Sequence, residues 1–223
     1  MSTTRAPANS VRCFQNELLA WSEREGRHFP WRNRSTTTYQ LVIAEVLLQR
    51  TRAETVARFF PRFIATFPSW KRLANASETE LREFLEPIGL WRRRAASITA
   101  LAREVNKRNG RVPALRSEIE SLPGVGQYIA NAILLLAHGC REPLLDVNMA
   151  RVLERFFGPR QFADIRYDPY LQALSKRIVD HKEAKRINLA VLDLGAKVCK
   201  SHNPRCKQCP LHGRCKYAQN NVL

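Results

Sequence analysis

The sequence predicts an all-α protein. Apolar residues recur at the three-to-four-residue spacing of one helix face, as Val11, Phe14, Leu18 and Trp21 do near the start. Nowhere do apolar and polar residues alternate over a length that would suggest a strand. The 223 residues contain no internal repeat and no Gly/Ser-rich linker, and they suffice for one large domain or two small ones.

The charge points to a polyanionic partner. Lys and Arg together number 37 against 20 Asp and Glu, which gives a net charge of +17. Such a field favours nucleic acid, and an acidic membrane surface is the alternative. No stretch approaches the roughly 20 consecutive apolar residues of a membrane span. Residues 1–10 lack the apolar core of a signal peptide, so we expect a disordered start and an intracellular, nucleoid-associated protein.

Apolar periodicity and capping signals place the helices in order. Pro30 ends the first helix, and Ser77 with Glu80 three residues later forms a capping-box pattern at the start of another. The expected helices span residues 11–25, 39–60, 62–67, 77–86, 92–108, 117–121, 127–138, 148–157, 170–180 and 184–198.

One acidic residue lies inside the most apolar of these helices. Glu45 interrupts the run Leu41–Leu48, which is apolar on nearly every side and therefore predicts a buried helix. Burial would favour the protonated form of Glu45, which could then deliver a proton. An ion pair with an arginine or an outlet to solvent is the alternative interpretation.

A basic segment joins two of the expected helices. Ile88-Gly-Leu-Trp-Arg-Arg-Arg94 places Leu90 and Trp91 beside three arginines. Apolar residues interleaved with arginine suit a protein that wedges into a base stack while holding phosphates. A solvated basic face with two core residues would show the same pattern.

The segment 122–146 combines a turn, a helix and an acid. In Leu122-Pro-Gly-Val-Gly126, two glycines two positions apart allow unusual backbone conformations and let helix-start amides face an anion. With a helix following in a basic chain, the motif resembles the helix-hairpin-helix, which binds the DNA backbone. Asp146 precedes the next helix, where helix capping and catalysis are both open to it.

Four of the six cysteines crowd near the end of the chain. Cys199, Cys206, Cys209 and Cys215 have the spacing C-x6-C-x2-C-x5-C. Four thiolates so close in sequence suit a structural zinc site or a [4Fe–4S] cluster, with disulfides as a third option. The other two, Cys13 and Cys140, are expected to be buried small apolar residues.

These motifs together resemble the helix-hairpin-helix DNA glycosylase superfamily over residues 11–216. The cysteine spacing is similar to that of endonuclease III and the MutY-type glycosylases, which implies a [4Fe–4S] cluster. The other matching segments are Pro30-Trp-Arg32, Glu45-Val-Leu-Leu-Gln-Arg-Thr51, Gly89-Leu90, Leu122-Pro-Gly-Val-Gly126, and Asp146-Val-Asn148 with Arg151-Val152.

The resemblance implies two helical domains with the DNA-binding active site in the cleft between them. A six-helix barrel domain with the helix-hairpin-helix would span 36–140, and residues 11–35 and 141–223 would form a discontinuous cluster domain. We expect a monomer acting on double-stranded DNA with a mismatched or damaged base, which it rotates out of the stack. A monovalent cation at the hairpin is a second candidate cofactor.

Tyr128 distinguishes between members of this superfamily. Endonuclease III-like enzymes have a catalytic lysine at this position, whereas this chain has no lysine between Ser117 and Arg141. A monofunctional glycosylase that uses water is therefore expected, with weak or absent lyase activity.

Two substrate classes remain open. The sequence is closer to the MIG-type thymine/uracil mismatch glycosylases in three features: Arg50, the Ile88–Ala95 segment and an end eight residues after Cys215. Gln49 and Arg52–Val56 are closer to MutY-type adenine glycosylases, which act on A·G or A·8-oxoguanine. A helix-hairpin-helix module without catalysis is the third hypothesis.

The resemblance also assigns roles to single residues. Asp146 would stabilise positive charge on the sugar, Glu45 would contact or protonate the base, and Tyr128 would line the pocket. The candidate DNA-contacting residues are Gln49, Arg50, Leu90, Gly124, Val125 and Gly126, and the cluster ligands are Cys199, Cys206, Cys209 and Cys215.

Overall fold

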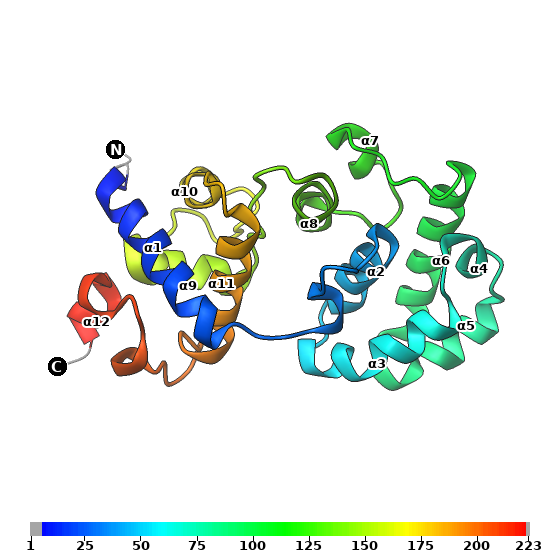
Figure 1. The fold of residues 1–223 in the computed structure, drawn as a ribbon, viewed down its shortest axis with the longest axis horizontal. Coiled ribbons are helices and arrows are strands. Elements are labelled where there is room, and N and C mark those ends of the chain that lie inside the picture. The colour runs from blue at the N-terminus through cyan, green and yellow to red at the C-terminus, as the bar shows by residue number, and fades with distance from the viewer. Residues whose placement is uncertain (1–5, 222–223) are drawn as a thin grey trace. The chain divides into compact units, whose positions relative to one another are not determined.

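The computed structural model describes residues 6–221 and is built from helices alone. Within these residues there are twelve α-helices, four short 3₁₀ helices and no strand, which confirms the all-α prediction. The chain divides into two compact units (Figure 1). We call His28–His138 the central unit, and Met1–Arg27 together with Gly139–Leu223 the terminal unit. No helix between residues 6 and 221 has the length and apolar character needed to cross a membrane.

The central unit contains seven α-helices around one core. Its elements are η1 (Pro30–Arg32), α2 (Thr38–Leu48), α3 (Ala53–Thr66), α4 (Trp70–Ala74), α5 (Glu78–Leu85), η2 (Glu86–Ile88), α6 (Trp91–Lys107), α7 (Arg116–Glu120) and α8 (Gln127–His138).

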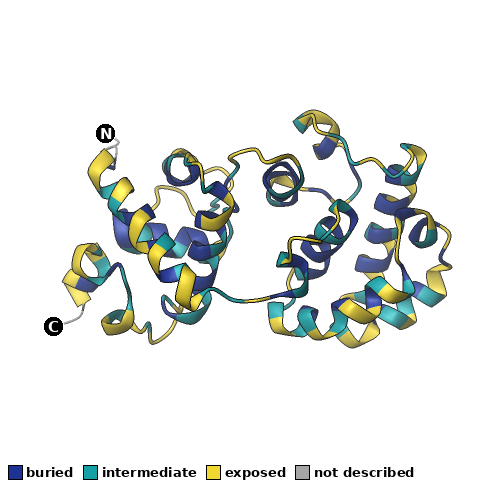
Figure 2. Cartoon of the chain, viewed as in Figure 1, coloured by how far each residue is buried: buried dark blue, intermediate teal, exposed yellow. Residues whose placement is uncertain are grey.

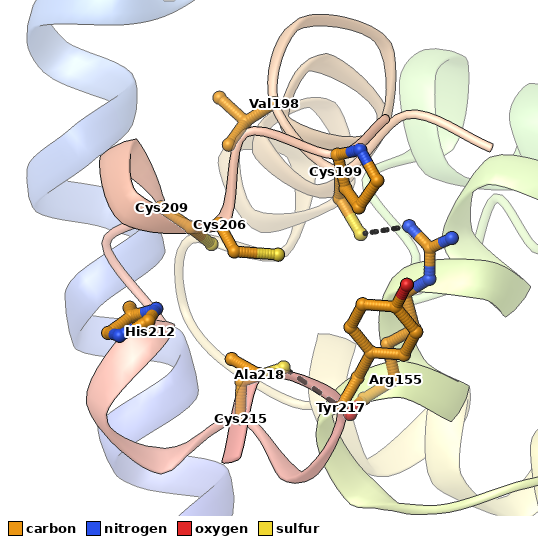
Figure 3. A pocket seen from close by; sticks show the side chains of 10 residues that line it. Arg155, Val198, Cys199, Cys206, Cys209, His212, Cys215, Tyr217 and Ala218 are labelled. Carbon is orange, nitrogen blue, oxygen red and sulfur yellow. Dashed lines mark hydrogen bonds between the residues drawn. The ribbon is translucent and has the colours of Figure 1, made fainter. Parts of the chain in front are cut away.

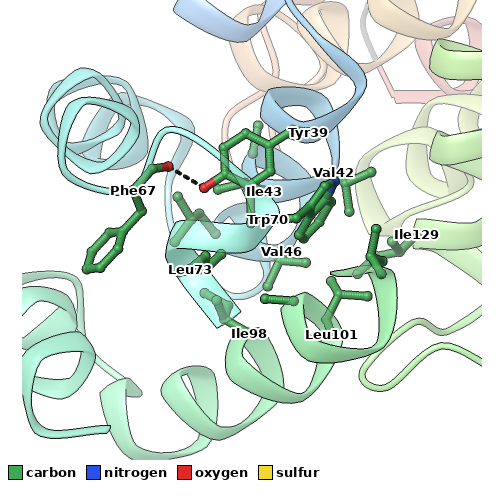
Figure 4. Close-up of a cluster of buried hydrophobic side chains, with 14 of the residues drawn as sticks. Tyr39, Val42, Ile43, Val46, Phe67, Trp70, Leu73, Ile98, Leu101 and Ile129 are labelled. Carbon is green, nitrogen blue, oxygen red and sulfur yellow. Dashed lines mark hydrogen bonds between the residues drawn. The ribbon is translucent and has the colours of Figure 1, made fainter. Parts of the chain in front are cut away.

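Figure 4 shows where α2, α4, α6 and α8 supply side chains to this core. Ile43, Leu73 and Ile98 are fully buried there. The Tyr39 hydroxyl donates to the carbonyl of Phe67, and burial raises the pKa of that hydroxyl. The Tyr39 hydroxyl can lie inside this apolar cluster because its hydrogen-bond donor has a partner.

The terminal unit packs helices from both ends of the chain. Its elements are α1 (Ala8–Glu25), α9 (Val147–Phe157), α10 (Pro169–Val179), α11 (Ala184–Lys197), η3 (Cys206–Gln208), η4 (His212–Arg214) and α12 (Lys216–Asn221). Phe14 of α1 is fully buried against Phe156 and Phe157 of α9, with ring centroids 5.0 and 5.3 Å away. Figure 2 shows the buried residues on the inward faces of these helices and exposed residues on their outer faces.

Two predicted boundaries differ from the structure. The disordered start expected over residues 1–10 is wrong for residues 6–10, because α1 begins at Ala8 and Ala6 is buried; residues 1–5 lie outside the described residues. Residues 28–35 fall in the central unit, whereas the domain prediction assigns them to the cluster domain.

The helix expected over residues 39–60 is two helices. α2 ends at Leu48 and α3 begins at Ala53, while the later break expected at Pro61 does not occur. Gln49–Arg52 contains neither glycine nor proline, and Arg50 takes a left-handed conformation with φ of 56°. The break therefore does not depend on a helix-breaking residue. Arg94 binds Gln49 and Thr51 within it.

The core of the central unit gives a stability prediction. Leu73→Ala removes a side chain with no exposed surface and should lower the free energy of unfolding by about 2–5 kcal/mol. The matched control is Leu115→Ala in the same unit, whose side chain is 64% exposed and which should change stability by less than about 0.5 kcal/mol. Denaturant unfolding of both variants measures the difference, and equal effects would contradict this account of the core.

Candidate active site and cysteine pocket

Asp146 is the N-cap of α9. Its Oδ1 accepts hydrogen bonds from the backbone amides of Asn148 and Met149, both at 2.8 Å. The predicted capping role is therefore confirmed. Its Oδ2 takes no part in the cap and accepts one bond, from Asn148 Nδ2 at 2.7 Å. A carboxylate oxygen has two lone pairs, so this oxygen keeps acceptor capacity beyond that bond.

Asn148 and Arg151 hold this carboxylate through a chain of side-chain hydrogen bonds. Arg151 Nη2 donates to Asn148 Oδ1 at 2.9 Å, which leaves the Asn148 amide nitrogen directed at Asp146. Arg151 Nη2 also donates to the carbonyl of Gly195, and its Nε donates to the carbonyl of Cys199 at 2.8 Å. The candidate acid is thus linked, in three hydrogen bonds, to the backbone of the first cysteine of the cluster motif.

Gly195 leaves space for the hydrogen-bonded side chains of Asn148 and Arg151 where α11 packs against α9. A Cβ built on Gly195 would lie 3.0 Å from Asn148 Cβ and 3.5 Å from Arg151 Nη2. Real Cβ atoms rarely approach others so closely, and neither neighbour can withdraw without breaking its hydrogen bonds. A glycine in the middle of α11 costs helix stability but permits the contact between the helices.

The four cysteines of the motif line one pocket in the terminal unit. All four are free of disulfides, and Figure 3 shows them around the pocket with His212, Arg155 and Tyr217. Among residues 6–221, no three Cys, His, Asp or Glu side chains form a group able to hold a metal ion. The disulfide alternative is not realised, and the thiols are spread around a shared space.

Arg155 links the pocket to α9. Its Nη1 approaches Cys199 Sγ at 3.4 Å and donates to the carbonyl of Lys200 at 2.7 Å. The same guanidinium lies 4.5 Å from the ring centroid of Tyr217. One arginine therefore contacts both ends of the cysteine segment, and its positive charge lies beside the Cys199 sulfur.

Burial affects the ionisation of the thiols in this pocket. Burial raises the pKa of the Cys209 thiol to about 12, and burial also raises the pKa of Cys215. Thiols in such surroundings bind as thiolates only when a metal centre compensates their charge. The buried Nδ1 of His212 has no hydrogen-bond partner within the described part of the chain. These residues fit a thiolate-bound metal centre.

The two remaining cysteines lie elsewhere. Cys13 is half-buried on α1. The prediction that Cys140 is buried is wrong, because it is exposed directly after α8. The chain turns there at Gly139, whose φ is +70°, so the apolar pattern of α8 does not continue to Cys140.

Glu45 and Tyr128 belong to the central unit. Glu45 is 8% exposed on α2, where it lies with apolar residues of α2 and α8 around a small cavity. The burial of this helix was expected from the sequence. Tyr128 is half-buried in the first turn of α8 and packs against the same core. Two polar groups of the central unit are thus placed on neighbouring helices.

The glycine turn divides its residues between surface and core. Gly124 has φ of +75°, a conformation that favours glycine, and Gly126 is exposed at the start of α8. Val125 differs from the prediction. Its side chain is 8% exposed within the core and its amide donates to the carbonyl of Leu122, so we withdraw it from the candidate DNA contacts.

The other candidate DNA contacts lie on two loops of the central unit. Gln49 and Arg50 are exposed between α2 and α3. Leu90 is 54% exposed before α6 and has a left-handed φ of 53°. Large apolar side chains are rarely so exposed on a strained backbone without a functional reason.

The sequence analysis missed two arginines with structural roles. Arg155 was not singled out, although it follows Arg151 by four residues and therefore shares its helix face. Arg94 was treated as one of three exposed basic residues. Its spacing of four and seven residues from Ile98 and Leu101 places it on the buried face of α6, and this was the available signal.

Comparisons with known proteins agree with the motifs. Thymine-DNA glycosylase of Aeropyrum pernix is 37% identical over 95% of this chain and 96% of its own length. Human adenine DNA glycosylase is 31% identical over 94% of this chain and 40% of its own length. A solved structure of a thermostable thymine-DNA glycosylase matches with a TM-score of 0.88 and 30% identity, covering 95% of this chain and 98% of that one.

The family assignment rests on a match that covers more than half of the chain. Residues 43–178 match the HhH-GPD superfamily of base excision DNA repair proteins, a range that contains Glu45, the glycine turn and Asp146. The resemblance drawn from the motifs is confirmed, and the chain belongs to the HhH-GPD superfamily of base excision DNA repair proteins.

Proposed function

We propose that the chain is a monofunctional DNA glycosylase that hydrolyses the N-glycosidic bond of thymine or uracil mispaired with guanine. The observation that carries this proposal is the likeness to thymine-DNA glycosylases, in sequence and in fold, over nearly the whole chain. The net charge of +17 supports a DNA partner. The Asp146 arrangement is compatible with catalysis, because Oδ1 forms the helix cap while Oδ2 accepts only one bond and keeps acceptor capacity.

Asp146 would act on the sugar. As the base departs, positive charge develops at C1′, and a fixed carboxylate stabilises it and orients the attacking water. Oδ1 is occupied by the cap, so Oδ2 is the oxygen for this role. The Asn148 amide holds the plane of the carboxylate without neutralising it, and Arg151 holds the amide.

Glu45 and Tyr128 would act on the base. Thymine and uracil can leave as anions when their carbonyl groups accept hydrogen bonds, and a protonated Glu45 or the Tyr128 hydroxyl could supply such bonds. The absence of lysine between Ser117 and Arg141 removes the amine that a Schiff-base lyase would need. Hydrolysis with little strand cleavage is the expected outcome.

The remaining site residues would hold the DNA. Gly124 and Gly126 would let the phosphate backbone approach the start of α8, where helix amides and the helix dipole favour an anion. A monovalent cation at this turn stays a prediction. Leu90 would fill the space left by the rotated nucleotide, and Gln49 and Arg50 would contact the base left behind.

The cysteine pocket would hold a [4Fe–4S] cluster through Cys199, Cys206, Cys209 and Cys215. Four thiols distributed around one space and the spacing of the motif support this assignment. The cluster would supply structural cross-linking of residues 199–215, which have only two short 3₁₀ helices of their own. Arg155 and the exposed basic residues of this segment would then be fixed for contact with phosphates.

The substrate test is excision from a panel of duplexes. With T·G, U·G, A·G and A·8-oxoguanine, abasic sites cleaved by alkali should appear for T·G and U·G. T·A and U·A duplexes provide the controls. Excision of adenine alone would assign the chain to the MutY type, for which the likeness to human adenine DNA glycosylase is the supporting observation. Binding without any abasic product would favour a non-catalytic module.

Asp146→Asn should abolish most excision and keep DNA binding. The variant keeps the size of the side chain but removes the negative charge, so a loss of roughly a hundredfold or more in single-turnover rate is expected. The control is Asp180→Asn, an acid of the same unit whose side chain is 70% exposed. Near-normal turnover by Asp146→Asn would remove Asp146 from the mechanism.

The cofactor assignment predicts about four iron atoms per chain in protein purified without oxygen. Cys209→Ser should lower the iron content and the visible absorption of the cluster, whereas Cys140→Ser, an exposed cysteine outside the pocket, should leave both unchanged. Elemental analysis decides between the metals. Zinc without iron, or full iron in the Cys209→Ser variant, would contradict the assignment.

A further inference from the structure

Two loops of the central unit carry backbone strain and exposed candidate DNA contacts at the same residues. Between α2 and α3, Arg50 has φ of 56°. Between η2 and α6, Gly89 has φ of 72° and Leu90 has φ of 53°. Residues other than glycine rarely adopt this left-handed backbone conformation, and the strain persists only where surrounding contacts fix it.

The side chain of Arg94 contacts both loops and fixes them. It is 6% exposed at the start of α6. Its Nη1 donates to the carbonyls of Gly89 at 2.7 Å and Ile88 at 3.3 Å. Its Nη2 donates to the carbonyl of Gln49 and to Thr51 Oγ1, both at 2.8 Å. One guanidinium therefore binds residues on both sides of Arg50 and the two residues before Leu90.

The geometry of the guanidinium suits this double contact. Its two terminal nitrogens are held in one plane, so the positions of the two loops are coupled through a rigid fork. Burial lowers the pKa of Arg94, yet a guanidinium remains charged in proteins. A buried charge is tolerated only when its donors are satisfied, and here carbonyl groups and one hydroxyl satisfy them.

We propose that Arg94 is the positioning residue that sets the Leu90 wedge and the Gln49–Arg50 contact with the opposite base as one unit. The proposal rests on the proposed function, which brings these residues to DNA. Insertion of Leu90 into the base stack and contact of Gln49 and Arg50 with the opposite base would then be coupled through Arg94. A shift of either loop would move the other, so recognition of the mismatch and insertion of Leu90 would succeed or fail together.

The test compares Arg94→Met with Arg103→Met. Methionine keeps much of the length and apolar contact of arginine but has no donor. Arg103 is an exposed arginine on the same helix and serves as the matched control. Single-turnover excision is measured on U·G and U·A duplexes with enzyme in excess. Circular dichroism and thermal unfolding report whether each variant is folded.

Arg94→Met should slow excision from U·G by about tenfold to a hundredfold, the range seen when a catalytic arrangement is displaced by about 1 Å. The ratio of the U·G rate to the U·A rate should also fall. A purely structural defect would reduce the amount of active enzyme on both duplexes and leave this ratio unchanged. Arg103→Met should keep the wild-type rate and ratio.

A double-mutant cycle with Leu90→Ala tests the coupling directly. If Arg94 acts through Leu90, the double variant should be about as slow on U·G as the slower single variant, because both changes remove the same wedge. Multiplicative losses would overturn the proposal. So would an Arg94→Met variant that keeps the wild-type rate and ratio.

Two milder variants decide the matter if Arg94→Met does not fold. Thr51→Val removes one of the four acceptors, and Arg94→Lys keeps a charge but loses the fork. Both should lower the U·G to U·A ratio by a smaller factor, and wild-type ratios in both would overturn the proposal. Failure of the proposed function is distinct, because the wild-type protein would then excise no uracil or thymine.

Discussion

A backbone carbonyl that leaves regular helix structure needs a hydrogen-bond donor, and in this protein the donor is repeatedly an arginine side chain. Arg94 binds three loop carbonyls in the central unit. Arg151 binds the carbonyls of Gly195 and Cys199, and Arg155 binds those of Lys200 and Ser201. In a fold made only of helices between residues 6 and 221, these contacts help to hold the irregular segments around Gln49, Gly89 and Lys200.

This use of arginine gives the high positive charge two meanings. Part of it is exposed and available to phosphates, as the sequence analysis expects. Another part is turned inward, where the guanidinium acts as a planar multiple donor more than as a charge. The distinction matters for mutational analysis, because loss of an exposed arginine weakens binding, whereas loss of an inward arginine displaces a loop.

Much of this organisation could be predicted from the sequence. Apolar spacing predicted α1, α8, α9 and α11 well, and the capping signal at Asp146 is realised with both amides at 2.8 Å. These features are local, since a helix and its cap depend on residues within one or two turns. The family motifs could likewise be identified from residue identities and, for the four cysteines, from their spacing.

The errors concern features that depend on distant residues. The break at Gln49–Arg52 contains no glycine or proline, and Arg94, more than forty residues later, holds it through Gln49 and Thr51. Val125 was a candidate DNA contact, but the turn that exposes Gly124 and Gly126 directs the valine into the core. Cys140 was expected to be buried as a small apolar residue outside the cysteine motif, but the chain has already turned at Gly139 and this cysteine is exposed.

Under the proposed function, the linkage between Asp146 and the cysteine segment would let a bound cluster orient the acid without taking part in the hydrolysis. Each hydrogen bond from Asp146 through Asn148 and Arg151 to Cys199 fixes an orientation. This series of hydrogen bonds ends at the backbone carbonyl of Cys199. The orientation of Asp146 therefore depends on how well the cysteine segment is ordered. That segment has little secondary structure of its own, and burial disfavours its thiolates unless a metal centre binds them. Ordering of the pocket and orientation of the acid are therefore parts of one arrangement, with Gly195 as the point where the two helices come close enough to allow it.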